Sequence, residues 1–200
     1  MQHELALPID HTTACTLRVG DVLFLTGDLF TARDQAHVLM LSLHASGSDL
    51  PFDPSQMALF HCGPIVSKHD NGWKIVAAGP TTSIRMEPFE DQFLKIFHPP
   101  IVIGKGGMGN DTSTALQSVG AVYAQYTGGA GALAAQRIDA VSSVYWLEEL
   151  GMTEAVWIVK VSKFGPLLVT MDAAGGNLYT DLDRTIAENV KAAIERIDSA

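Results

Sequence analysis

Cysteine is scarce in this sequence. Only Cys15 and Cys62 occur among 200 residues, and two well-separated cysteines fit a reducing compartment. A cubane iron–sulfur cluster usually needs three or four thiolates, so this chain cannot supply a full ligand set. No Cys-x-x-Cys pair and no paired-histidine spacing typical of zinc sites is present. His61 beside Cys62 comes nearest, but neighbouring residues of a strand face opposite sides, so we predict no metal ligands in this chain.

Positive charge and long apolar runs are also scarce. The formal net charge is −9, from 13 Lys and Arg against 22 Asp and Glu, whereas a nucleic-acid-binding protein needs a basic stripe. No stretch approaches the roughly 18–20 uninterrupted apolar residues of a membrane span. Met1 to Asp10 lacks the basic and then apolar pattern of a signal peptide. We therefore expect no nucleic-acid partner, no membrane association and a cytoplasmic location.

The composition is otherwise that of a globular protein. Apolar residues make up 47% and charged residues 18% of the chain, and no repeat, low-complexity segment or linker divides it. We therefore predict a single domain over residues 1–200. Apolar runs of strand length are found at Val22–Leu25, Met57–His61, Trp73–Ala77, Ile101–Ile103, Ala121–Tyr126, Val141–Trp146, Ala155–Val161 and Leu167–Met171.

Helical patterns lie between some of these runs. Thr31 to His44 begins with a Thr-x-x-Asp capping-box spacing, and Ser83 to Phe97 follows a cluster suited to capping. Asp181 to Ile197 carries one apolar face, which we interpret as core packing rather than as a partner site. Trp157–Val161 and Leu167–Met171 are too close for a crossover helix, so we predict a hairpin. This disfavours a purely parallel doubly wound sheet and favours an α/β fold with mixed sheets and helices on one side.

Two glycine loops match dinucleotide-binding patterns. Gly104-Lys-Gly106-Gly-Met-Gly109 spells GxGxxG and Gly129-Ala-Gly131-Ala-Leu-Ala134 spells GxGxxA, each after an apolar run. A dinucleotide-binding oxidoreductase is therefore an alternative. However, a predicted hairpin follows the second loop, and the strand after the first loop ends without an acid for the ribose. We interpret both loops as tight turns, although the glycines around Lys105 would let a ligand approach it.

Three segments share one layout, in which an apolar strand leads through small or polar residues to a cation. They are Leu25-Thr-Gly27 with Thr31-Ala-Arg33-Asp34, Ala78-Gly-Pro-Thr81-Thr-Ser83 with Arg85, and Ile103-Gly-Lys105-Gly106. A helix N-terminus attracts anions, and arginine matches a carboxylate with two hydrogen bonds. Together the three cations predict a small polycarboxylate ligand. For any single segment, a capped helix with a surface arginine is an equally good interpretation.

Asp34 and His37 follow Arg33 closely. They are three residues apart and therefore share one face of the predicted helix. We expect them to support the site by orienting Arg33 or each other. A proton-carrier role for His37 is the alternative.

Taken together, these segments resemble the β subunit, or C-terminal domain, of the class I iron–sulfur fumarate hydratases and L(+)-tartrate dehydratases. The matching strings run along nearly the whole chain: Val19-Gly-Asp21, Leu25-Thr-Gly27, Thr31-Ala-Arg-Asp34 with His37, Leu50-Pro-Phe-Asp53, Gly63-Pro64, Gly79-Pro-Thr-Thr-Ser83 with Arg85-Met86, Gly104-Lys-Gly106, Gly128-Gly129 with Ala132-Leu133, Glu149-Leu-Gly151 with Glu154-Ala-Val-Trp157, Phe164-Gly-Pro166, and Asp172 with Gly176-Asn177. The strings around Arg33 and Arg85 are specific, and their order relative to Lys105 is more so.

The resemblance implies a swivelling β/β/α fold and an α subunit, expected in an α2β2 assembly, that carries a [4Fe–4S] cluster. It also implies that Arg33, Thr81, Arg85 and Lys105 line the substrate pocket, with Thr81 and Lys105 as the catalytic candidates. Thr81 is considered for proton transfer in this family, but a lone threonine is a poor base and would need activation from the partner. Ala130-Gly131 and His61-Cys62 depart from the family pattern at positions not assigned to chemistry.

The expected chemistry is that of a hydro-lyase acting on a small dicarboxylate. Removing a proton next to a carboxylate builds up negative charge, and cations already in place stabilise it. We expect fumarate as the substrate because of the Phe164-Gly-Pro166 stretch and His61. L(+)-tartrate is the alternative. A non-catalytic carboxylate-binding module on the same fold is a further hypothesis, which the complete set of three cationic segments disfavours.

Overall fold

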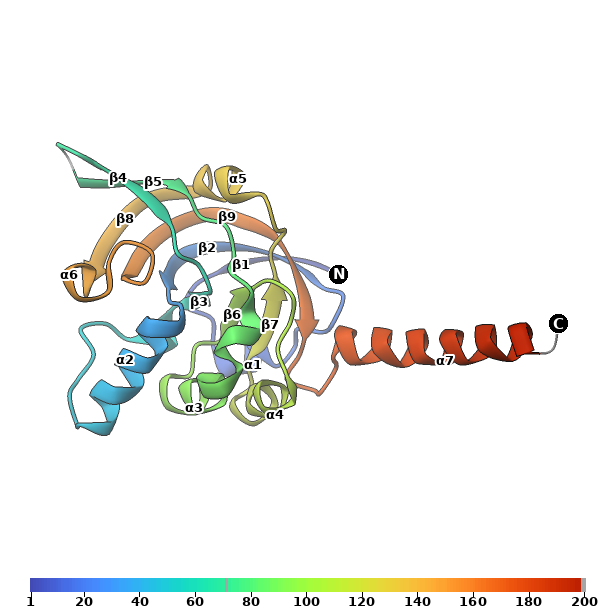
Figure 1. Ribbon diagram of the computed structural model, residues 1–200. Helices are drawn as coiled ribbons and strands as arrows, with labels where there is room; N and C mark the ends of the chain where they lie inside the picture. The colour runs from blue at the N-terminus through green and yellow to red at the C-terminus, as the bar shows by residue number, and fades with distance from the viewer. Residues whose placement is uncertain (71, 199–200) are drawn as a thin grey trace.

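The computed structural model describes residues 1–70 and 72–198, and its main element is a curved seven-stranded sheet (Figure 1). The strands follow the order β1 (Gln2–Ala6), β2 (Val22–Thr31), β3 (Ala58–Phe60), β6 (Ile101–Gly104), β7 (Val122–Gln125), β9 (Val156–Met171) and β8 (Ile138–Tyr145). Strand β2 also pairs with β9. The strands β2, β3, β6, β7 and β9 therefore close into a barrel-like sheet, with β1 and β8 paired at its margins.

The sheet is mixed, as the sequence predicts. Neighbours along the series β1, β2, β3, β6 and β7 are parallel, whereas β9 is antiparallel to β2, β7 and β8. Because parallel strands end at the same edge, the segments that follow β2, β3, β6 and β7 leave the sheet on one side.

Helices cover one side of this sheet, which confirms the predicted α/β arrangement (Figure 1). They are α2 (Asp34–Ala45), α3 (Glu87–Phe97) and α4 (Asn110–Val119). Side chains of β3, β6 and β7 alternate between two cores. Phe60, Ile103 and Ala124 belong to the core enclosed by the barrel, whereas Leu59 and Val102 belong to the core beneath the helices.

The remaining described elements connect this framework. They are α1 (His11–Ala14), η1 (Pro54–Gln56), β4 (Ile65–His69), β5 (Gly72–Ala77), η2 (Ser83–Met86), α5 (Gly131–Ala135), α6 (Leu147–Leu150) and α7 (Leu178–Asp198). The pair β4–β5 forms a separate two-stranded sheet that extends from the body beside β8 (Figure 1). The sequence pattern did not predict β1 or β4.

The predicted hairpin near the C-terminal side is wrong, because β9 is one continuous strand of 16 residues. Its first part pairs with β8 and its last part with β7, while β2 pairs along both. The intervening residues Lys163 (φ 48°) and Gly165 (φ 158°) bend the strand instead of reversing it. A side chain at Gly165 would lie 2.5 Å from the Leu23 carbonyl oxygen, so glycine permits the tight approach of β2.

The capping box predicted at Thr31 is also wrong. Thr31 ends β2, and its hydroxyl accepts a hydrogen bond from the Trp157 amide of β9 (3.0 Å). The helix α2 begins at Asp34, and Arg33 occupies its N-cap position without a side-chain capping bond. The helix predicted over residues 83–97 is divided into η2 and α3.

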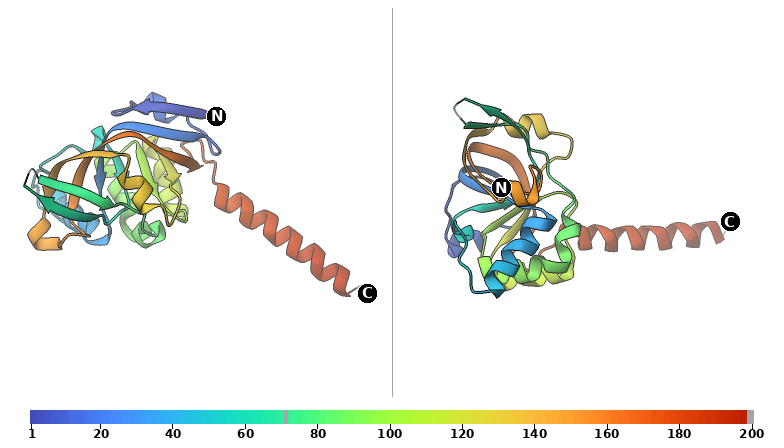
Figure 2. Two further views of the ribbon diagram at one scale, coloured as in Figure 1. Left: turned by 90° about the horizontal axis from the view of Figure 1, so that it is seen from above. Right: turned by 60° about the vertical axis from the view of Figure 1, so that its left-hand side comes forward.

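Helix α7 projects away from the body in every view (Figures 1 and 2). Its apolar side chains form a stripe that is about half exposed or more, which we call the α7 stripe: Leu182, Ile186, Val190, Ile194 and Ile197. The interpretation of this face as core packing is therefore wrong. None of the described helices is both long and apolar enough to cross a membrane.

Candidate active site

The three cationic segments meet at the edge where the parallel strands end. Arg33 follows β2 and Lys105 follows β6, while the intervening strand β3 leads into His61. The segment containing Thr81 crosses this edge, because its amide donates to the His61 carbonyl (2.7 Å). Segments that are far apart in the sequence are thereby joined through hydrogen bonds of the backbone.

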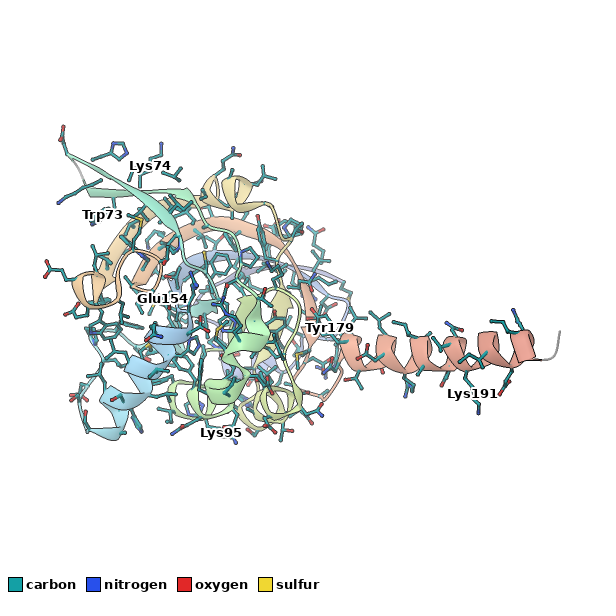
Figure 3. The ribbon with its side chains drawn as sticks, viewed as in Figure 1. Trp73, Lys74, Lys95, Glu154, Tyr179 and Lys191 are labelled. Carbon is teal, nitrogen blue, oxygen red and sulfur yellow. The ribbon has the colours of Figure 1, made fainter. Side chains whose placement is uncertain are left out.

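The Arg33 side chain is mostly buried between the body and Glu154. Its Nη2 lies 3.1 Å from Glu154 Oε1, and the side chain is 23% exposed. Figure 3 labels Glu154 above the N-terminal end of α2. A side chain at Gly63 would lie 2.6 Å from Arg33 Nη1, so glycine at this position makes room for the guanidinium. The sequence pattern had not indicated a role for Glu154 at this site.

Asp34 binds Arg85, not Arg33. Arg85 Nε donates to Asp34 Oδ1 at 3.3 Å, and Nη2 donates to Oδ2. Burial alone would raise the pKa of Asp34, but the bonds from Arg85 and from its own backbone amide outweigh burial and lower it. The expectation that Asp34 orients Arg33 is therefore corrected, since Asp34 orients the other arginine and its bonds do not use Arg85 Nη1.

Lys105 is fixed through its backbone. Its amide donates to Ser83 Oγ (3.1 Å), and its carbonyl accepts from the Ser83 amide (3.0 Å). A side chain at Gly104 would lie 1.9 Å from Ser83 Oγ, so the glycine before Lys105 is what allows this contact. The half-buried Lys105 has no ion pair with any residue of the described chain.

His37 lies beneath these segments and does not contact the Arg33 guanidinium. Its Nδ1 donates to the Arg33 backbone carbonyl (2.8 Å), and its Nε2 lies 3.2 Å from Glu90 Oε2. His61 Nε2 lies 3.3 Å from the same oxygen, and all three side chains are fully buried. The sequence pattern indicates no contact of His37 with Glu90 or His61, because neither shares a helical turn or a motif with His37.

Burial and mutual attraction act in opposite directions on the charges of Glu90 and His61. Burial alone would raise the pKa of Glu90, but the neighbouring imidazoles of His61 and His37 outweigh it and bring the pKa to about 2. Burial lowers the pKa of His61 despite the attraction of Glu90. Glu90 is therefore held in its ionised form by positive charge beside it, and its charge is coupled to that of the two imidazoles.

Neither glycine loop forms a dinucleotide site. The first loop leads into α4, where a pyrophosphate would need the free amides of the helix N-terminus. The Glu87 carboxylate already accepts from the amides of Gly109 (2.7 Å), Asp111 (3.1 Å) and Thr112 (3.2 Å). The second loop leads into α5, which has only five residues. A negative charge at the first loop and a single turn at the second both argue against the oxidoreductase alternative.

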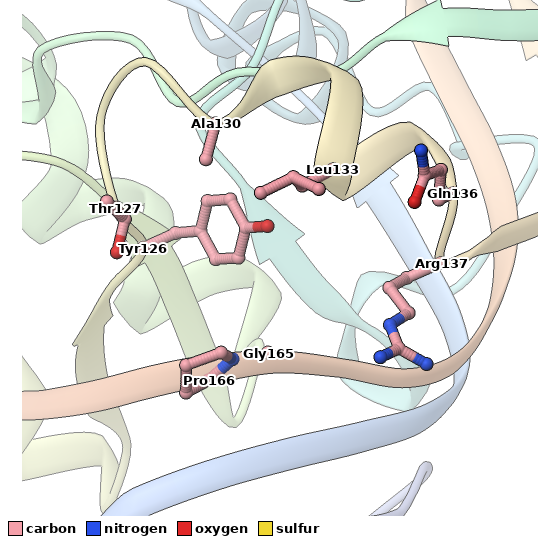
Figure 4. Close-up of a pocket in the computed structure, with 8 residues that line it drawn as sticks. All are labelled: Tyr126, Thr127, Ala130, Leu133, Gln136, Arg137, Gly165 and Pro166. Atoms are coloured by element: carbon pink, nitrogen blue, oxygen red, sulfur yellow. The ribbon is translucent and has the colours of Figure 1, made fainter.

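A hollow of about 500 Å³ lies beside the segment that follows β7 (Figure 4). Its lining residues are Tyr126, Thr127, Ala130, Leu133, Gln136, Arg137, Gly165 and Pro166. None of the residues predicted for the site is among them. The exposed Arg137 in this hollow is therefore a useful comparison for the arginines of the candidate site.

The residues of this chain do not fit an iron–sulfur cluster. Cys62 is buried, and burial strongly raises the pKa of its thiol, which disfavours the thiolate that a cluster needs. Cys15 is the one other cysteine in the sequence. Within residues 1–70 and 72–198, the one convergent group of three potential ligands consists of His37, His61 and Glu90 and contains no cysteine.

Comparison with known proteins identifies relatives over nearly the full chain. The model of the family described as "Fumarase C-terminus" matches residues 3–182. The chain is 41% identical to the L(+)-tartrate dehydratase subunit beta of Escherichia coli K12, covering 98% of this chain and 96% of the relative. It is 40% identical to a putative L(+)-tartrate dehydratase subunit beta of Methanocaldococcus jannaschii, covering 89% and 91%. It is 39% identical to a putative class I fumarate hydratase of Geobacillus stearothermophilus, covering 98% of this chain and 37% of that longer relative.

Proposed function

The chain belongs to the Fumarase C-terminus family, and from that premise we propose that it is the β subunit of a hydro-lyase that removes water from L(+)-tartrate. The relatives of matching length are named as β subunits of tartrate dehydratases, whereas the fumarate hydratase relative is much longer. This reverses the order of the two substrates expected from the sequence. Fumarate remains the second candidate because the Geobacillus relative has nearly the same identity.

The observation that carries this proposal is the set of cations at one edge of the sheet. Lys105 has no ion pair within the described chain, and Asp34 holds Arg85 by two atoms and leaves Nη1 available. Arg33 is fixed by Glu154 on one side. Such preoriented cations suit a ligand with two carboxylates, because each arginine keeps donors beyond those used by its protein partner.

In the proposed reaction these residues bind and stabilise charge. Loss of a proton from the carbon next to a carboxylate spreads negative charge onto the carboxylate oxygens, and Lys105 and Arg85 are the groups proposed to stabilise it. The hydroxyl leaves from the adjacent carbon. Thr81 is the candidate for proton transfer within this chain, and its backbone is held by the His61 carbonyl (2.7 Å). Its hydroxyl would still need a base from outside the chain.

The proposal assigns the [4Fe–4S] cluster to an α subunit, because the two cysteines of this chain do not fit it. The α7 stripe supports such a partner, since about half or more of each side chain is exposed. Tyr179 at the base of α7 (labelled in Figure 3) hydrogen-bonds to Gln125. Its ring packs against Gly107, in space that a larger residue at that position would fill. The interface with a partner bound to α7 would therefore start next to the loop that contains Lys105. We include in the proposal a single domain of the swivelling β/β/α type, an α2β2 assembly and a cytoplasmic location.

The test is an assay of the chain purified anaerobically together with a candidate α subunit that carries the cluster cysteines. Dehydration of L(+)-tartrate and hydration of fumarate are measured on the same preparation, with iron and sulfide content determined. We expect activity only in the complex and a higher kcat/KM for L(+)-tartrate. A higher kcat/KM for fumarate would replace the substrate, and activity with neither dicarboxylate would overturn the proposed function.

A further inference from the structure

His37, His61 and Glu90 converge from three different elements. His37 lies on α2, His61 follows β3 directly, and Glu90 lies on α3. Each side chain is 0% exposed, and one ligand atom of each lies within 4.8 Å of the others. Two imidazoles and a carboxylate are a donor set that zinc and other divalent transition metals accept.

The hydrogen bonding of this group is incomplete without a cation. A carbonyl oxygen can only accept, so the bond to the Arg33 carbonyl places the proton of a neutral His37 on Nδ1 and leaves a lone pair on Nε2. That lone pair faces Glu90 Oε2 at 3.2 Å. His37 Nε2, His61 Nε2 and both oxygens of Glu90 are buried without a hydrogen-bond partner among the described residues. Buried acceptors that face each other are costly unless a proton or a metal ion lies between them.

The spacing of each imidazole nitrogen from the carboxylate suits a shared ion. The two Nε2 atoms lie 3.2 and 3.3 Å from Glu90 Oε2. With zinc–ligand bonds of about 2.0–2.2 Å, these separations correspond to ligand–metal–ligand angles of roughly 100–105°, near the tetrahedral value. The pairs are close and yet not hydrogen-bonded.

The second ring nitrogen, Nδ1, of each histidine also has a partner. His61 Nδ1 lies 3.0 Å from Ser83 Oγ, which also accepts from the Lys105 amide (3.1 Å) and bonds to the Tyr123 hydroxyl (2.9 Å). Ser83 Oγ accepts from the Tyr123 hydroxyl as well as from the Lys105 amide, which fixes its position beside the His61 ring. A metal ion on His61 Nε2 would place the ring proton on Nδ1, facing Ser83 Oγ. Metal-binding histidines are usually held through their second nitrogen in this way.

We propose that His37, His61 and Glu90 bind one divalent transition-metal ion, with zinc as the expected ion. The ion would cross-link α2, the end of β3 and α3 beneath Arg33, Thr81 and Lys105. The complete burial of all three ligands gives it a structural role without contact to substrate, and three protein ligands leave one position for water. The ligands come from widely spaced segments, so the sequence spacing predicts no such site.

The proposal is tested on the full-length chain. Metal content is measured after purification without chelators or immobilised metal, and the stripped chain is titrated calorimetrically with Zn²⁺ and with Co²⁺. We expect one equivalent of Zn²⁺ per chain, a rise in Tm with Zn²⁺, and visible absorption bands of four-coordinate Co²⁺. Glu90→Gln should lose stoichiometric binding. Ser83→Ala, which leaves all three ligands in place but removes the hydroxyl beside His61 Nδ1, should weaken binding about tenfold.

His44→Gln on the exposed face of α2 is the matched control and should bind as the unmodified chain does. Circular dichroism checks that each variant is folded. If Glu90→Gln does not fold, the metal affinity of Ser83→Ala and the Co²⁺ spectrum of the unmodified chain test the site instead. A stripped chain that binds neither ion stoichiometrically would overturn the site. So would a folded Glu90→Gln variant that binds Zn²⁺ as tightly as the unmodified chain, and a shared proton would then hold the cluster. Neither result depends on catalytic activity, so the proposed function is tested separately.

Discussion

Asp34 holds Arg85 through both of its carboxylate oxygens. The two residues come from the first turn of α2 and from η2, which follow different strands. Their pairing fixes the plane of the Arg85 guanidinium and aims its remaining donors. The cation proposed to bind substrate is therefore oriented by a residue that does not need to touch the substrate.

Arg85→Lys in the α/β complex is expected to lower activity by about a hundredfold to a thousandfold, although it preserves the charge. Lysine cannot bind Asp34 and a substrate carboxylate with one planar group. The measurement is kcat/KM on L(+)-tartrate at equal cluster content. Arg137→Lys, in the hollow of Figure 4, is the control and should be nearly silent. The opposite pattern would place the substrate in that hollow.

Asp34→Asn should lower stability in a pH-dependent way. The folded-state pKa of Asp34 lies below its ordinary value, so its contribution is fully present above the unfolded pKa of about 3.9 and disappears as the pH falls through the folded pKa. Urea unfolding should give a constant difference between the two proteins from about pH 7 to 5, and a smaller one below about pH 4. A difference that grows on acidification would contradict this assignment.

The chain purified alone should contain no acid-labile sulfide and should be inactive. Cys62 is buried with a thiol that resists ionisation, and Cys15 cannot hold a cubane cluster alone. Sulfide analysis after anaerobic purification is the decisive measurement, because a metal bound by His37, His61 and Glu90 would bring no sulfide. Stoichiometric sulfide in the lone chain would show that it holds a cluster itself.

The chain should not bind NAD or NADP measurably. The Glu87 carboxylate occupies the amides at the start of α4, where a pyrophosphate would otherwise bind. Calorimetric titration tests this expectation. Micromolar binding that Gly131→Val abolishes would instead support the oxidoreductase alternative.

The α7 stripe should contribute to assembly with the α subunit. Burying an isoleucine contributes about 1.5–3 kcal/mol, so Ile186→Asp combined with Ile194→Asp should weaken the complex at least about a hundredfold. Lys191→Ala on the same helix (labelled in Figure 3) is the control. Analytical ultracentrifugation of the mixed subunits measures both. Unchanged assembly of the double variant would show that the stripe is not the interface.

Much of the fold follows from local patterns. The alternation of apolar residues predicts β6, β7 and part of β2, and the apolar period predicts α7 to within a few residues. The same patterns fail at β9, because a bend at Lys163 and Gly165 and a reversal produce similar local signals. Only pairing with β2, β7 and β8 distinguishes a continuous strand from a hairpin.

The sequence alone determined the family and the identity of the cations, because Arg33, Arg85 and Lys105 lie in short contiguous motifs. Tertiary structure alone decided their partners, since Glu154 and Asp34 reach the arginines across the fold. It also decided that His37 meets Glu90 and His61 in a buried group. Such contacts depend on which strand ends lie side by side, and the spacing of residues along the chain does not predict that order.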